Sequence, residues 1–193
     1  PIDDRDTGIV VLRSGTVVMS WFTSLLFAQH EKISLKYAQQ VENLTDDDRR
    51  WEGNWTRRST DNGKTWEDPV RTAGSCPHGP IQLHDHRLLL VGNRDRIHSE
   101  VVIEESKDEG QSWKVISEIP VPQNLKEMNF CEPHMIETSP GRLIAMFRTA
   151  YKAKPEERNL WQSVSEDGGK TWSVPKRTVI WGYPPHLLKL SDG

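Results

Sequence analysis

The sequence predicts an all-β protein built from repeated four-stranded antiparallel sheets. Three observations support this fold class: a tryptophan-ended octamer occurs three times, a strand–turn–strand unit recurs between the octamers, and turn-forming residues are abundant. Hydrophobic residues make up only 35% of the 193 residues, whereas there are 13 glycines, 12 prolines and 8 tryptophans. Short strands with frequent turns produce this balance more readily than packed helices do.

The octamers share the pattern S-x-D-x-G-x-T-W, with Ser in place of Thr in the second copy. They span residues 59–66, 106–113 and 165–172, and their aspartates are Asp61, Asp108 and Asp167. An Asp carboxylate accepts backbone N–H bonds two residues on, and Gly supplies the positive φ of a tight turn. We therefore predict that the octamers are hairpin turns and that these aspartates are structural.

The units between the octamers complete a repeat of about 50 residues, which matches a four-stranded propeller blade. We expect a β-propeller of four-stranded antiparallel blades, of which residues 1–193 supply about three blades and the first strand of a fourth. The expected bounds are about 5–72 for blade 1 with an insertion at 23–52, 76–122 for blade 2, 131–181 for blade 3 and 184–193 for the start of blade 4.

Within the blades, two kinds of pattern predict how deeply the strands are buried. The apolar runs 88–91 and 143–147 predict strands buried on both faces, and the polar alternation in 101–106 and 160–165 predicts outer strands.

The insertion holds a short helix candidate at 36–44 and an acidic run at 46–48. We interpret that run as a solvated loop rather than as a calcium site.

Charge and composition exclude several classes of partner. The 25 basic residues against 28 acidic ones give a net charge of −3, which argues against binding to nucleic acid or to a membrane surface. No apolar run is long enough to span a bilayer, and the first residues carry no signal peptide. Because the chain stops inside a turn at 191–193, we expect either missing C-terminal blades or a second copy to close the ring.

The chain resembles the Asp-box (BNR-repeat) sialidases and neuraminidases, six-bladed propellers that release terminal sialic acid. The resemblance covers essentially the whole chain, as the N-terminal half of those enzymes. As in that family, Arg5 stands ten residues before Gly15, and Glu132-Pro133 leads to Phe147-Arg148. One departure is that Arg5-Asp6-Thr7 stands where the family has Arg-Ile-Pro.

This resemblance implies a set of catalytic and substrate-binding residues. Arg5 and Arg148 would be two of three arginines that grip the substrate carboxylate, and Glu132 would be the general base for a Tyr nucleophile. The acid/base residue would lie in the insertion, where Asp46, Asp47, Asp48 and Glu52 are candidates and Asp48 is favoured. Guanidinium forks suit a carboxylate, and a phenol needs a base to become a nucleophile. The third arginine and the Tyr would lie in later blades, so this fragment alone is expected to be inactive.

Three histidines fall outside the sialidase template. His78, His134 and His186 occupy the same place in successive repeats, and we expect their imidazoles to approach one pocket and bind substrate. A zinc site with Cys76 and Cys131, or histidines that simply pack at strand starts, are the alternatives. We assign no metal and no cofactor, and interpret both cysteines as free buried thiols rather than a disulfide.

The resulting hypothesis is a retaining, sialidase-like glycoside hydrolase that removes a terminal acidic sugar from a glycan. One alternative is a propeller polysaccharide lyase or another glycosidase that uses the histidines. Another is a carbohydrate-binding propeller without catalysis. The expected glycan substrate favours a secreted or periplasmic location. Five tryptophans could stack on sugar faces, but a tryptophan on a strand more often belongs to the core. We interpret these five as core residues: Trp21, Trp51, Trp55, Trp161 and Trp181.

Overall fold

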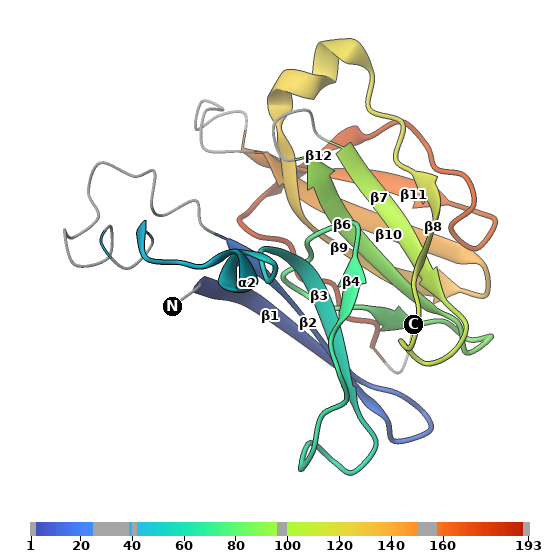
Figure 1. Cartoon of the computed structure of the whole chain (residues 1–193). Coiled ribbons are helices and arrows are strands. Elements are labelled where there is room, and N and C mark those ends of the chain that lie inside the picture. Colours follow the sequence, from blue (N-terminus) through green and yellow to red (C-terminus); the bar gives the residue numbers. More distant parts are fainter. Residues whose placement is uncertain (1–2, 25–38, 40–41, 96–99, 150–157, 191–193) are drawn as a thin grey trace.

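The computed structural model describes residues 3–24, 39, 42–95, 100–149 and 158–190. They form three antiparallel sheets of four strands each, in chain order (Figure 1). The first sheet contains β1 (Asp3–Val11), β2 (Val17–Ser24), β3 (Gly53–Ser59) and β4 (Val70–Thr72). The second contains β5 (Ile81–Gln82), β6 (Leu88–Asp95), β7 (Glu100–Ser106) and β8 (Lys114–Glu118). The third contains β9 (Phe130–Ser139), β10 (Arg142–Thr149), β11 (Asn159–Ser165) and β12 (Lys176–Trp181). The all-β prediction is confirmed.

Helical structure is short where the chain is described. Helix α2 (Asp46–Arg49) lies in the insertion, and the 3-10 helix η2 (Gln123–Met128) joins the second sheet to the third. The helix expected at 36–44 lies largely outside the described residues. No helix in the described ranges is long and apolar enough to cross a membrane.

Burial of the strands follows the apolar runs but not the polar alternation. Residues Leu88–Val91 of β6 are at most 1% exposed, as predicted. Strand β7, expected to be an outer strand, pairs with both β6 and β8 and buries Glu104 to 3% exposure. The Glu104 carboxylate accepts the backbone N–H groups of Ala73 (2.9 Å) and Gly74 (3.1 Å). Glu104 therefore links the loop after the first sheet to the second sheet. The alternation of polar and apolar residues in 101–106 did not indicate exposure.

Each octamer folds into the same hydrogen-bonded turn. In the first copy, Ser59 Oγ donates to the Asp61 carboxylate and accepts the N–H of Gly63 at 2.9 Å. Thr65 adds two further hydrogen bonds, because its backbone N–H and its hydroxyl both donate to the Asp61 carboxylate. The second and third octamers repeat every one of these bonds. The fifth position needs glycine, since φ there is 81° to 89°.

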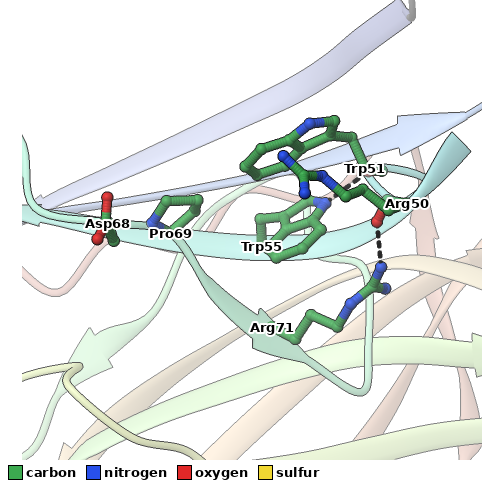
Figure 2. Close-up of a pocket in the computed structure, with 6 residues that line it drawn as sticks. All are labelled: Arg50, Trp51, Trp55, Asp68, Pro69 and Arg71. Carbon is green, nitrogen blue, oxygen red and sulfur yellow. Dashed lines mark hydrogen bonds between the residues drawn. The ribbon is translucent and has the colours of Figure 1, made fainter. Parts of the chain in front are cut away.

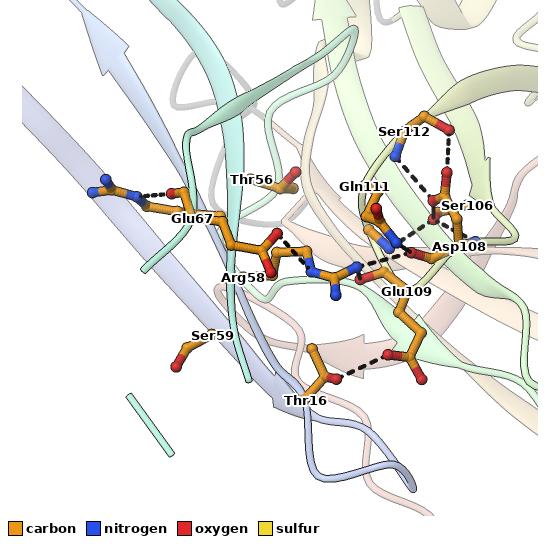
Figure 3. Close-up of polar contacts among 12 residues, drawn as sticks. Thr16, Thr56, Arg58, Ser59, Glu67, Ser106, Asp108, Glu109, Gln111 and Ser112 are labelled. Carbon is orange, nitrogen blue, oxygen red and sulfur yellow. Dashed lines mark hydrogen bonds and ion pairs between the residues drawn. The ribbon is translucent and has the colours of Figure 1, made fainter. Parts of the chain in front are cut away.

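The second octamer fastens the second sheet to the first, as Figure 3 shows for its polar contacts. Arg58 of β3 donates to the carbonyl of Asp108 at 3.0 Å. The indole N–H of Trp113 donates to the hydroxyl of Thr56 at 2.8 Å. Thus residues of the turn reach back across the gap between two sheets.

The third octamer makes the equivalent connection to the second sheet. Ser117 of β8 donates to the carbonyl of Gly169, and Trp172 is 8% exposed. Its indole belongs to the main core, together with Leu89 and Ile103 of the second sheet. The same core continues into the third sheet, so an octamer contributes to the packing of the sheet that precedes it.

We predict that the octamer carboxylates make the fold acid-sensitive. Hydrogen bonds from Thr65, and likewise from Thr171, lower the pKa of Asp61 and Asp167 to about 2, from an ordinary 3.8. Because the folded pKa is depressed, this stabilisation is complete above about pH 4 and is lost as the pH falls through 2.

Urea unfolding at pH 7, 4, 3 and 2 tests this prediction. The double variant D61N/D167N should be less stable than wild type at pH 7, and the difference should shrink towards pH 2. Asp47→Asn, at a side chain 77% exposed, is the control and should leave the pH profile unchanged. Equal pH slopes for wild type and the double variant would contradict the prediction.

Candidate functional site

The first strands of the three sheets approach one another at a common place. A Cβ added to Gly8 of β1 would lie 2.0 Å from the backbone nitrogen of Gly79, so only glycine fits there. The Cys76 thiol, three residues before Gly79, donates to the carbonyl of Pro133 at the start of β9 at 3.6 Å. The first sheet thus touches the loop before β5, and that loop touches β9.

The three predicted histidines meet at this place. The His78 and His134 ring centroids are 4.8 Å apart, and the His186 ring stacks on His134 at 4.7 Å. One ring nitrogen from each residue lies within 4.8 Å of the other two. The structure therefore brings the imidazoles together, and their role in binding substrate stays a prediction.

Burial keeps two of these imidazoles neutral. Burial, together with the neighbouring His78 and His186, lowers the pKa of His134 to about 3. Burial also lowers the pKa of His78, although Glu132 and Asp6 act in the opposite direction. The site near neutral pH consequently offers hydrogen bonds from these two rings rather than positive charge.

Glu132 and Arg148 form a two-pronged ion pair beside the histidines. Nε and Nη2 of Arg148 each donate to one oxygen of Glu132. Burial is the largest single influence and acts to lower the pKa of Arg148, but the hydrogen bonds to Glu132 and the neighbouring charges together outweigh it and hold that pKa above its usual value. The guanidinium also lies over the Tyr183 ring, 4.1 Å from its centroid. A substrate carboxylate would therefore have to displace Glu132 to be gripped by this fork.

The remaining predicted residues lie in less confined surroundings. Arg5 is exposed on β1, opposite Phe22. Asp48 is exposed in α2, where its carboxylate accepts the N–H and hydroxyl of Thr45 and completes a capping box. These bonds lower the pKa of Asp48, whereas a general acid needs a raised one. The geometry favours a helix-capping role, and the catalytic assignment of Asp48 stays a prediction.

Two residues of this neighbourhood were missed from the sequence. Asp6 lies at a bulge of β1 with φ 52° and contributes to the field at His78. Tyr183 packs against Arg148. Asp6 could have been found, because it stands where the family pattern has another residue. Nothing in the sequence pattern singled out Tyr183.

The cysteines are free and buried, as expected. Burial raises the pKa of the Cys76 thiol to about 11, so it stays protonated and donates to the Gly79 and Pro133 carbonyls. A metal needs the thiolate, and this geometry argues against the alternative of a zinc site that includes Cys76.

A hollow of about 400 Å³ is lined by residues of the first sheet and of the segments that flank its strands (Figure 2). Trp51 and Trp55 are 5.4 Å apart there, and Arg71 lies over Trp55 at 4.3 Å. Trp55 is 8% exposed and belongs to the core, whereas Trp51 is 38% exposed. Trp181, also interpreted as core, is 65% exposed.

We predict that Glu132 and Arg148 depend on each other for stability. Their side chains are 26% and 12% exposed, so removing one partner leaves a poorly hydrated charge. Glu132→Gln and Arg148→Met should each lower the free energy of unfolding by about 1–3 kcal/mol. The double variant should lose clearly less free energy of unfolding than the two single variants lose in sum.

Urea titrations of the four proteins measure this coupling. Glu118→Gln is the matched control, because Glu118 pairs with Arg94 on the surface and its side chain is 54% exposed; it should change stability by less than about 1 kcal/mol. Strict additivity of the two single changes would show that the pair is not coupled.

Comparisons with known proteins agree with this architecture. The family model of the BNR repeat-like domain matches residues 10–184. A protein of unknown function from Dyadobacter fermentans is 21% identical, with a TM-score of 0.72 over 98% of this chain and 54% of that one. The NanB sialidase from Streptococcus pneumoniae is 15% identical, with a TM-score of 0.62 over 93% of this chain and 40% of that one.

A third similar structure is the α-L-arabinanase of Penicillium chrysogenum, 18% identical, with a TM-score of 0.59 over 92% of this chain and 49% of that one. The chain therefore spans about half or less of these solved chains. No curated protein matches it. Because the family model matches residues 10–184, which is most of its length, the chain belongs to the BNR repeat-like domain family.

Proposed function

We propose that this chain is part of a glycoside hydrolase whose sheets are blades of a β-propeller. The observation that carries the proposal is the position of Glu132, a carboxylate held on β9 next to the place where β1, the loop before β5 and β9 meet. Solved proteins with similar sheets include sialidases and an arabinanase, which supports glycoside chemistry. Hydrolysis of a glycosidic bond needs a carboxylate of this kind.

The propeller arrangement is supported by the direction in which octamers dock. The second and third octamers each contact the preceding sheet, whereas no described sheet precedes the first octamer. Strand β1 turns Val10 towards the second sheet and leaves Ile9 and Val11 exposed at 61% and 67%. At the other end, Val179 of β12 is 96% exposed. Both apolar faces would be covered if further blades, from the same protein or from a second copy, closed a ring.

The blade bounds proposed for the ring are those expected from the repeats: about 5–72, 76–122, 131–181 and, for a fourth blade, 184–193. Each of the first three ranges overlaps one of the sheets described above, although β1 begins at Asp3 and β9 at Phe130, just before the proposed bounds.

The finer proposal is that the substrate is a terminal sialic acid, removed with retention. Its carboxylate would be held by Arg5 and Arg148, and Glu132 would act as the base for a nucleophile. On this hypothesis the substrate exchanges with Glu132 on the Arg148 fork and so frees the Glu132 carboxylate. Asp48 would serve as acid/base only if substrate draws it away from Thr45.

A lyase that uses the histidines is the second candidate. It is favoured by His78, whose buried Nε2 has no hydrogen-bond partner among residues that the structure describes and whose neutral ring suits a base. The two functions leave different products, because a lyase creates an unsaturated sugar that absorbs in the ultraviolet.

The experiment for the proposed function is an assay of the full-length protein on aryl glycosides that include a sialoside and an arabinofuranoside. Glu132→Gln should lower kcat/KM about 100-fold or more, while Glu118→Gln, in the exposed pair on β8, should not. Each variant is compared at matched folded fraction. Unchanged activity of Glu132→Gln would overturn the assignment of Glu132.

Two further outcomes decide the finer proposal. Release of sialic acid that survives Arg5→Ala would show that the arginine assignment is incorrect. Ultraviolet absorption at the cleaved end of a polysaccharide would replace the hydrolase by the lyase.

We also predict that the uncovered apolar faces associate when the 193-residue chain is produced alone. Native mass spectrometry should detect self-association that Val179→Lys reduces, because a charge on a buried contact is costly. Gln111→Lys adds the same charge at an exposed turn and should leave association unchanged. A monomeric wild-type chain at all concentrations would contradict association through these faces.

A further inference from the structure

His134 is locked as a hydrogen-bond donor. The backbone N–H of Leu187 donates to His134 Nδ1 at 2.7 Å, and an N–H group can only donate. Nδ1 must therefore carry a lone pair, and the proton of the neutral ring resides on Nε2. Protonating both nitrogens would set two N–H groups against each other. The only nitrogen of His134 that is left to a ligand is thus an N–H donor.

His78 supplies a second, unsatisfied position. Its Nε2 is buried and has no hydrogen-bond partner within the described residues, although buried polar atoms are normally paired. No hydrogen bond from the described part of the chain fixes the tautomer of this ring, so Nε2 can accept or donate. A ligand atom that both donates and accepts would satisfy it in either state.

The spacing of the rings fits one small oxygen-bearing group. One nitrogen from each histidine, Nδ1 or Nε2, lies within 4.8 Å of the others, and the ring centroids of His78 and His134 are 4.8 Å apart. An oxygen that makes two hydrogen bonds of about 2.8 Å bridges a gap of this size. A hydroxyl group meets the need, since it accepts from His134 and donates to or accepts from His78.

From these observations we propose that His134 and His78 form a subsite for a sugar hydroxyl group, with His134 donating through its Nε2–H. The subsite deepens the proposed function and rests on it, because the hydroxyl belongs to the glycan substrate. His186, which stacks on His134, forms the exposed wall of the subsite.

The same geometry disfavours the two other ligand classes. A metal held by all three histidines needs a lone pair from each, and the available nitrogen of His134 carries a proton. A carboxylate would meet the negative field that Glu132 and Asp6 exert at His78. Any acidic group of the substrate should therefore lie elsewhere, and this position selects an uncharged part of the sugar.

Long-range proton–nitrogen NMR of the ¹⁵N-labelled chain tests the proposal. His134 should be neutral, with its proton on Nε2. Methyl α-L-arabinofuranoside and methyl β-D-galactopyranoside, added to saturation in turn, are the probes, and at least one should shift the ring nitrogens of His78 and His134. Zinc chloride should leave the His134 signals in place. A proton on Nδ1, stoichiometric zinc coordination by the three rings, or no response to either sugar would overturn the subsite.

Kinetics of the full-length protein separate this proposal from the proposed function. His134→Leu should raise KM about tenfold, as expected for one lost hydrogen bond, and His134→Gln, which restores an N–H donor, should recover part of the loss. His86→Asn is the matched control, because His86 is exposed with φ 71°, a conformation that Asn tolerates.

If wild type hydrolyses no glycoside while the sugars still shift His78 and His134, hydrolysis fails and the subsite stands. If hydrolysis occurs but His134→Leu and His134→Gln both keep the wild-type KM, the subsite alone fails.

Discussion

The carboxylate of each octamer aspartate holds a turn together, and in the second and third octamers the surface of that turn contacts the preceding sheet. Asp61 binds Thr65 through both backbone and hydroxyl, and Ser59 links the carboxylate to the glycine that reverses the chain. Because the turn is fixed internally, its carbonyl groups and its tryptophan are presented in a constant direction. Arg58 and Thr56 bind these groups in the second octamer. The spacing of the sheets therefore depends on the hydrogen bonds within and around each such turn, and not on a large hydrophobic core alone.

Close stacking of the sheets determines where the candidate site forms. Gly8 and Gly79 approach backbone to backbone, and Gly74 and Gly92 do the same between the first and second sheets, where an added Cβ would lie under 3.0 Å from backbone atoms. Around the Gly8–Gly79 contact, β1, the loop before β5 and β9 come close together. His78 lies in that loop, and Glu132 and His134 lie in the first half of β9, so the same approach that packs the sheets also concentrates polar side chains at one place.

The sequence predicted features whose physics is local and repeated. The octamers were recognisable because a turn needs Asp, Gly and a hydroxyl at fixed spacing, and the meeting of His78, His134 and His186 followed from their equal places in three repeats. The hydrogen-bond partners that a side chain finds outside its own sheet were not predictable in this way. The N–H groups that pair with the buried Glu104 carboxylate come from residues 73–74, in the loop after the first sheet. The alternation of polar and apolar residues around Glu104 would be the same with or without these partners.

In the candidate site too, the sequence did not predict which charged residues pair with each other. The resemblance assigned Glu132 and Arg148 separate tasks, and the structure places them on each other. In the unbound state each thereby satisfies the other, so the pair presents little net charge to a ligand. The neighbouring imidazoles are kept neutral by burial, and Leu187 fixes the direction in which His134 donates. Under the proposed function, such a site would recognise a sugar first by its hydroxyl groups, and an acidic substrate would gain the charge of Arg148 only by separating it from Glu132.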